Sequence, residues 1–244
     1  MGSNMGSSFS VHKRLLWVGI FGVAMAFLES AVVIYLRVIY YPAGFNFPLA
    51  PIEGKIAVTE ILRELATIIM LLSVGILTGR DLAERFSYFI YCFAIWDIFY
   101  YVFLYLVIGW PESLMTWDIL FLIPVTWVGP VITPVLVSLT MILLAVFILY
   151  KKQRITGFRL SKLTETLLLA GALIIFLSFI WDYSTYLFEY FELKEIWHFS
   201  GNDKLLEVAN NYIPRKFNWI LFCLGELVIA GSIYSVAADK RSFN

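Results

Sequence analysis

This chain has few of the residues and motifs that mark a soluble catalytic domain. Only 15% of its 244 residues are charged, against roughly 25% in soluble domains. Its two cysteines, Cys92 and Cys223, form no metal-binding motif and imply no disulfide framework. We find no phosphate loop, dinucleotide-binding glycine pattern, nucleophile elbow or zinc motif. The formal net charge is zero, so nothing in the charge balance indicates a nucleic-acid partner.

Apolar side chains, in contrast, are abundant. Hydrophobic residues make up 61% of the chain and aromatic residues 18%, and the mean hydropathy is +0.82. This composition predicts a multi-pass protein of the lipid bilayer in which residues 1–244 form a single transmembrane domain. Residues 1–12, rich in glycine and serine, are expected to be a disordered tail. The first apolar run is a full span without a clear cleavage site, so we expect no cleavable signal peptide.

Six apolar runs reach the length of about 20 residues that a membrane-crossing helix needs. They cover residues 15–36, 57–78, 86–108, 130–150, 163–188 and 217–236. With six spans, the basic segment 151–162 and both termini lie on the cytoplasmic side, as the positive-inside rule favours. We therefore predict an all-α polytopic protein of the plasma (inner) membrane, with 114–129 as a re-entrant or interfacial segment. The alternative is seven transmembrane helices, in which 114–129 also crosses.

Ionisable side chains inside or beside these spans gather at the middle and outer depths of the bilayer. They are Glu29, Glu60, Arg63, Glu64, Asp97, Asp118, Asp182 and Glu226. Because a charge in hydrocarbon is costly, such residues usually face a polar interior. One arginine cannot balance seven acids, so the remaining acids must be protonated, hydrated or bound to a cation.

A divalent metal ion is one candidate for that cation, because carboxylate oxygens are ligands that magnesium, calcium and manganese accept. The candidate metal ligands are Glu29, Glu64, Asp97, Asp182 and Glu226. The chain has two histidines, which argues against most transition-metal sites. One of them, His198, lies in a predicted outer loop, where it could be a ligand or general base or simply a solvated side chain.

Asp97 lies in the middle of an otherwise uncharged run, in the motif Ile95-Trp96-Asp97. On a helix, Tyr100 and Tyr101 share its face, so their phenols could hydrogen-bond it. Residues 180–191 match residues 95–106 at six of twelve positions, which predicts a weak internal repeat relating the helices at 86–108 and 163–191.

In the second copy, Asp182 takes the place of Asp97 and Tyr186 that of Tyr101. We therefore add Tyr100, Tyr101 and Tyr186 to the eight ionisable residues as predicted ion- or substrate-binding residues. The alternative for Asp97 and Asp182 is a structural role as hydrogen-bonding links between helices.

Three functions fit an acidic, aromatic-walled site that opens to the outer side. The first is a small cation- or proton-coupled transporter or channel. The second is an intramembrane metal-dependent enzyme acting on a lipid-like or quinone-like substrate. The third is a non-catalytic membrane subunit, in which every acid has a donor partner. The expected partners are a small ion or small molecule and, since six spans are few for a pore, further copies of the chain.

Overall fold

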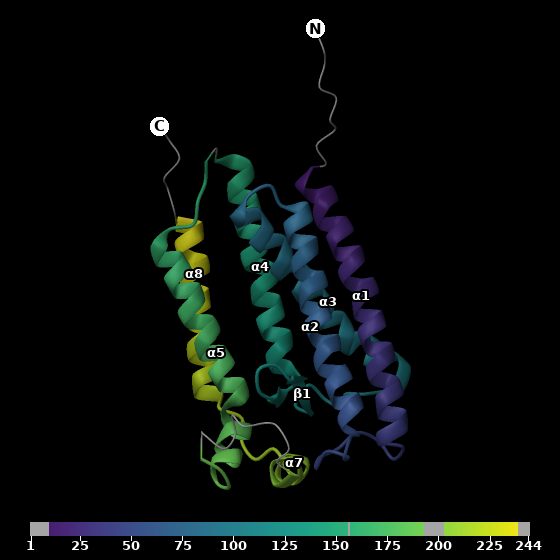
Figure 1. Cartoon of the computed structure of the whole chain (residues 1–244). Helices are drawn as coiled ribbons and strands as arrows, with labels where there is room; N and C mark the ends of the chain where they lie inside the picture. Colours follow the sequence, from purple (N-terminus) through teal and green to yellow (C-terminus); the bar gives the residue numbers. More distant parts are fainter. Residues whose placement is uncertain (1–9, 156, 193–202, 239–244) are drawn as a thin grey trace.

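The computed structural model describes residues 10–155, 157–192 and 203–238, and this part contains six helices long and apolar enough to cross a membrane (Figure 1). They are α1 (Val11–Tyr40), α2 (Gly54–Thr78), α3 (Leu82–Ile108), α4 (Ile132–Arg154), α5 (Lys162–Phe188) and α8 (Trp219–Ala238). A short helix, α7 (Asp203–Asn210), precedes the last of them. Large apolar side chains such as Leu77 and Ile220 are exposed on the outward faces, where lipid tails would cover them. The predicted all-α, six-span membrane fold is confirmed.

The segment at 114–129 forms two strands, so the seven-helix alternative is wrong. Strand β1 (Trp117–Phe121) pairs antiparallel with β2 (Trp127–Pro130), and Asp118 lies opposite Gly129. Aromatic and β-branched residues are common in these strands, and such residues suit a pleated backbone. Pro124, which cannot continue a helix, lies in the loop between the strands.

The helices pack as two groups that meet along α4. In the larger group, α3 is central and packs against α1, α2 and α4. In the smaller group, α5 and α8 pack against each other and lie side by side in Figure 1. Their approach is close, because a Cβ atom on Gly171 would lie 2.7 Å from Ile229 and one on Gly225 would lie 2.6 Å from Ile175. Helix α8 also contacts α4 and so joins the two groups.

The β-hairpin lies between these groups and reaches far along the helices. On one side, the Phe121 ring stacks on Phe93 of α3 with centroids 6.1 Å apart. On the other side, the Trp127 ring lies 5.0 Å from Phe176 and 5.9 Å from Phe179, both on α5. Phe93 is fifteen residues from the end of α3, about 22 Å along the helix axis. The hairpin therefore contacts the bundle interior as well as its rim.

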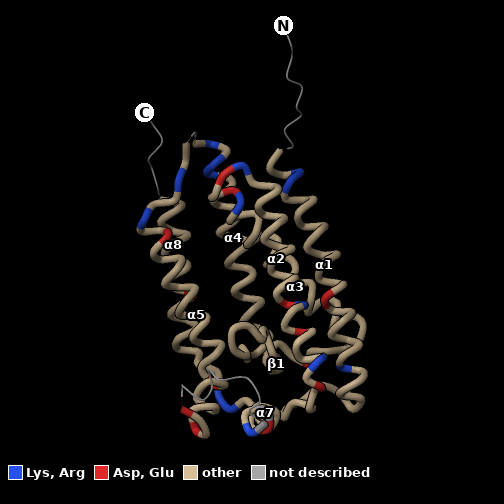
Figure 2. Tube along the Cα trace, viewed as in Figure 1, with Lys and Arg blue, Asp and Glu red and all other residues tan. Residues whose placement is uncertain are grey.

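The two ends of the bundle differ in charge, and we name them accordingly. The basic end holds residues 10–14, 79–85 and the described part of 151–162; the hairpin end holds residues 41–53, 109–131 and the described part of 189–218. Figure 2 shows lysine and arginine concentrated at the basic end, with acidic residues within the helices toward the hairpin end. Some charges at the basic end are paired, as in the contact of Arg80 with Glu84 at 2.8 Å.

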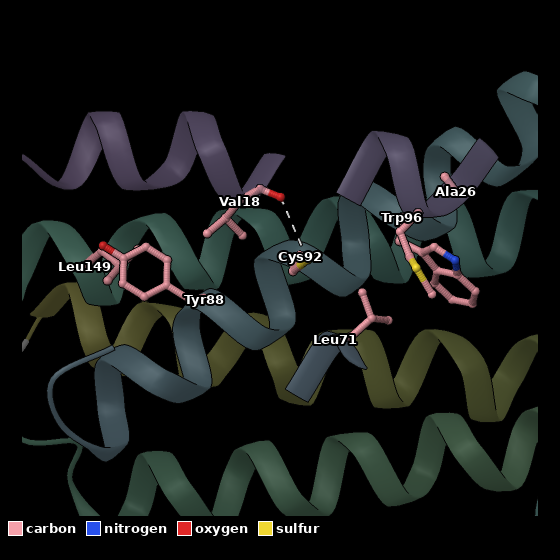
Figure 3. Packing of buried hydrophobic residues seen from close by; sticks show 8 residues of the cluster. Val18, Ala26, Leu71, Tyr88, Cys92, Trp96 and Leu149 are labelled. Carbon is pink, nitrogen blue, oxygen red and sulfur yellow. Dashed lines mark hydrogen bonds between the residues drawn. The ribbon is translucent and has the colours of Figure 1, made fainter. Parts of the chain in front are cut away.

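Between the basic end and the level of Asp97, the larger group is filled with apolar side chains (Figure 3). Leu71, Tyr88 and Cys92 are fully buried there, and the Cys92 thiol lies 3.8 Å from the Val18 carbonyl oxygen. We call this packing, together with Ala26, Trp96 and Leu149, the apolar cluster. It separates the buried acids from the basic end.

Candidate functional site

Arg63 binds two of the predicted acids. Its guanidinium pairs with Glu29 of α1, and its Nε donates to Glu60 at 2.9 Å. Thr67, one turn further along α2, donates to the other oxygen of Glu29 at 3.2 Å. Arg63 is thus shared by two carboxylates, which joins α1 to α2.

Glu64 holds the tip of the hairpin. The backbone N–H of Leu122, directly after β1, lies 3.1 Å and 2.9 Å from its two carboxylate oxygens. Among the described residues no lysine or arginine donates to Glu64, although Arg63 lies near enough to act on it electrostatically. This buried carboxylate is therefore stabilised mainly by one backbone donor and by the nearby positive charge of Arg63.

A second buried ion pair joins Asp118 of β1 to Arg37 of α1. Arg37 Nη2 lies 3.1 Å from Asp118 Oδ1, and Asp118 is only 2% exposed. The guanidinium also lies over the Trp110 ring at 3.6 Å and the Phe45 ring at 4.4 Å. Burial raises the pKa of Asp118 to about 6, even though Arg37 acts in the opposite direction.

We did not predict Arg37 as a site residue, because the first span was expected to end at 36. That boundary was wrong: α1 continues to Tyr40, and the first residue that cannot be helical is Pro42. The extended helix places Arg37 about two turns beyond Glu29 on a neighbouring part of the same face. Continuing the helical pattern as far as the proline could have revealed it.

Asp97 lies deeper in the bundle and has fewer donors. Its Oδ2 accepts a hydrogen bond from the Ser138 hydroxyl of α4 at 2.8 Å, and the residue is 9% exposed. The hydrogen bonds expected from Tyr100 and Tyr101 are absent from the described part of the chain. Asp118 and Asp97 instead act electrostatically on the Tyr101 hydroxyl, and Asp97 itself is influenced by Asp118.

Tyr100 connects the two ion pairs. Its electrostatic neighbours are Asp118, Arg37, Glu29 and Arg63. The structure therefore brings eight of the predicted residues into one region, which we call the acidic site. They are Glu29, Glu60, Arg63, Glu64, Asp97, Tyr100, Tyr101 and Asp118, with Arg37 added. Five carboxylates then face two guanidinium groups, so the predicted excess of acid persists within the described residues.

Glu226 of α8 is linked to a different face of α4. Its Oε2 accepts a hydrogen bond from Thr140 at 2.8 Å, and its Oε1 is buried without a hydrogen-bond partner in the described structure. Ser138 and Thr140 are two residues apart, so their side chains point to nearly opposite sides of the helix. Helix α4 thus presents one hydroxyl to Asp97 and another to Glu226.

Asp182 is outside the acidic site and is fully engaged. It accepts hydrogen bonds from the Tyr212 hydroxyl at 2.7 Å, the Arg215 backbone N–H at 2.9 Å and the Lys216 backbone N–H at 3.1 Å. Tyr186 donates to the Val208 carbonyl at 3.0 Å and has no hydrogen bond to Asp182. These contacts attach the segment before α8 to α5.

The arrangement does not favour a metal centre. Among the described residues, no three or more histidine, cysteine, aspartate or glutamate side chains are grouped closely enough to hold a metal ion. The proposed ligands are dispersed, since Asp182 binds Tyr212 and Glu226 binds Thr140. His198, the other candidate ligand, lies outside the described residues.

Comparisons with protein-family models, with curated proteins and with solved structures find no match to this chain. We therefore infer function from the chemistry of these side chains.

Proposed function

We propose that this protein is a proton-coupled membrane transporter with Asp97 as its central proton-binding group. The observation that carries the proposal is the environment of Asp97, a buried carboxyl that accepts one hydroxyl hydrogen bond and has no cation bonded to it in the described structure. Desolvation favours the neutral form of such a group, so a proton can bind at modest cost. A carboxylate with both oxygens bound by an arginine could not exchange protons as readily.

The partner on α4 suits both protonation states. A serine hydroxyl can donate to an ionised carboxylate and accept from a protonated one, so Asp97 keeps its contact with Ser138 when it gains or loses a proton. Thr140 offers the same contact to Glu226. We propose Glu226 as a second proton-binding group across α4, with Glu29, Glu60 and Glu64 lining the route toward the hairpin end.

The architecture supports a carrier better than an open pore. We expect the basic end to be cytoplasmic by the positive-inside rule, so the acidic site faces outward and the apolar cluster seals the inner half. Alternating access would move α5 and α8 relative to the larger group along α4. The hairpin would be re-entrant, because irregular backbone at membrane depth is tolerated when it is buried in protein, and Phe121 and Trp127 pack against α3 and α5 here.

Proton flux into liposomes tests the proposal. Purified protein is reconstituted into liposomes with a trapped pH-sensitive dye. The outside solution is made more acidic than the lumen, which contains Na⁺, K⁺ or Mg²⁺ as the cation to be exchanged for protons. We expect acidification of the lumen with at least one cation and a loss of at least tenfold in Asp97→Asn. Glu112→Gln, which removes an exposed carboxylate of the hairpin end, is the matched control and should retain the flux. Wild-type flux that Asp97→Asn leaves unchanged would contradict the role of Asp97.

The non-catalytic subunit remains a second candidate for a specific reason. Each of the seven predicted acids accepts at least one hydrogen bond from the protein, as a purely structural polar interior would require. This candidate predicts no flux above protein-free liposomes with any cation. The metal-dependent enzyme gains no comparable support from the described residues, among which no three or more histidine, cysteine, aspartate or glutamate side chains are grouped to hold a metal ion.

A further inference from the structure

We propose that Asp118 relays protons between the hairpin end and Asp97, with Tyr101 between the two carboxyls and Arg37 as the positioning residue. The inference rests on the proposed role of Asp97 and assigns the route by which that group exchanges its proton. The predicted repeat, the six spans and the distribution of acids do not by themselves say how Asp97 exchanges its proton.

The buried ion pair of Arg37 and Asp118 contains two atoms without a hydrogen-bond partner in the described structure. Only Oδ1 of Asp118 meets Arg37, and Asp118 Oδ2 and Arg37 Nη1 are buried without a hydrogen-bond partner in the described structure. A buried polar atom left unpaired is destabilising, so two in one pair call for a water, a proton or both. A proton on Oδ2, or a water bridging Oδ2 and Nη1, would satisfy them.

The ion pair lies nearer to the hairpin end than Asp97 does. Arg37 lies three residues from the end of α1, whereas Asp97 lies eleven residues inside α3 from Ile108, about 16 Å along the axis. Tyr101 follows Asp97 by four residues on the same face, about 6 Å nearer the hairpin end. It interacts with Asp118 and with Asp97. Asp118, Tyr101 and Asp97 thus form a series that leads inward from the hairpin end.

The transfer itself needs only oxygen-bound protons. The proton on Asp118 Oδ2 moves to the Tyr101 hydroxyl oxygen as the proton of that hydroxyl moves, through an intervening water, to the Asp97 carboxylate. One O–H bond breaks and one forms at each exchange, and Tyr101 ends neutral. Asp118 is left ionised beside Arg37, and water at the hairpin end returns its proton.

The surroundings of Asp118 suit repeated loading. Arg37 faces it from α1, Tyr100, Tyr101 and Asp97 face it from α3, and the Ile119 backbone N–H also acts on it. Burial holds its pKa at about 6, so both protonation states are populated near neutral pH. Trp110 and Phe45 enclose the Arg37 guanidinium and keep it beside the carboxylate.

Time-resolved infrared spectroscopy after a pH jump tests the relay in the full-length, detergent-solubilised protein. The carbonyl band of protonated Asp97 is identified as the band that Asp97→Asn removes. We expect Asp118→Asn and Tyr101→Phe each to slow the appearance of this band at least tenfold while leaving its final amplitude within about twofold. Glu112→Gln should leave the rate unchanged.

Three results would overturn the relay: an unchanged rate in Asp118→Asn, equal slowing in Glu112→Gln, or an Asp97 band that does not respond to pH. If Asp118→Asn fails to fold, Tyr101→Phe decides alone, because it keeps the ring and removes one hydroxyl. The measurement uses no membrane gradient. Absence of liposome flux would therefore refute the transporter, whereas the rate at which the Asp97 band appears would still test the relay.

Discussion

Asp97 and Asp182 share the sequence Ile-Trp-Asp and differ in almost everything around it. Asp182 accepts three hydrogen bonds, two of them from backbone N–H groups, whereas Asp97 accepts one from Ser138 among the described residues. The preceding tryptophans differ in the same way, since Trp96 is 5% exposed and Trp181 is 48% exposed.

The contrast shows that the role of a membrane carboxylate depends on which distant segment meets it. The partners of Asp182 come from residues 212–216, about thirty positions later, and they satisfy its charge with fixed donors. The region around Asp97 meets the hairpin and α4 instead, which supply one hydroxyl and another acid, Asp118. A repeat relating the two helices, which stays a prediction, would therefore have diverged in function.

Removing each carboxylate should separate the two roles most strongly. We expect Asp182→Ala to lower the free energy of unfolding by about 4 kcal/mol, because three hydrogen bonds to a charged group are lost and their donors are stranded. Asp97→Ala should cost about 1 kcal/mol, since it loses one hydrogen bond and also removes a buried charge. Chemical unfolding in mixed micelles measures both changes in the free energy of unfolding. Equal losses of stability in the two variants would contradict the different roles of Asp97 and Asp182.

The pH dependence of stability should sharpen the comparison next. Folded Asp118 has a pKa of about 6 against an ordinary value of 3.8, so the folded protein binds this proton more tightly than the unfolded chain. Raising the pH through this window should therefore lower the wild-type free energy of unfolding, by up to about 3 kcal/mol at 1.36 kcal/mol per pKa unit. Asp118→Asn should lack this decline. Parallel unfolding curves for the two proteins between about pH 4 and pH 6 would contradict the assignment.

A smaller effect should come from the packing of α5 on α8. Gly171→Ala should destabilise the protein by about 2 kcal/mol, because the added Cβ meets Ile229 and overpacks the contact. Gly231→Ala is the matched control, since a Cβ there meets nothing within 4 Å, and it should stabilise α8 by up to about 1 kcal/mol. Thermal unfolding of the two variants in the same detergent would compare them, and a neutral Gly171→Ala would indicate a loose helix pair.

The sequence predicted the spans well because crossing a bilayer demands long apolar runs. It also predicted that acids would lie inside, and the structure gathers Glu29, Glu60 and Glu64 in one region. It failed where the outcome depended on tertiary contact. The strands at 117–130 are short and apolar, a pattern that hydropathy cannot distinguish from a short helix.

Individual partners were the least predictable part of the site. Arg37 was missed because a charge near the end of a span resembles the start of a loop. The donors to Asp182 and the hydroxyls of Ser138 and Thr140 carry no local signal of what they will meet. Their roles arise only when α4 and the segment before α8 pack against the rest.

The hairpin has a thermodynamic consequence for the whole protein. Asp118 of its first strand pairs with Arg37, and the backbone N–H at its tip donates to Glu64. Trp127 of its second strand packs on α5. In the proposed carrier, protonation of these acids and displacement of α5 would be linked equilibria that share this hairpin. Such linkage is reciprocal: a movement of the smaller helix group would change the proton affinity of the larger one by the same free energy.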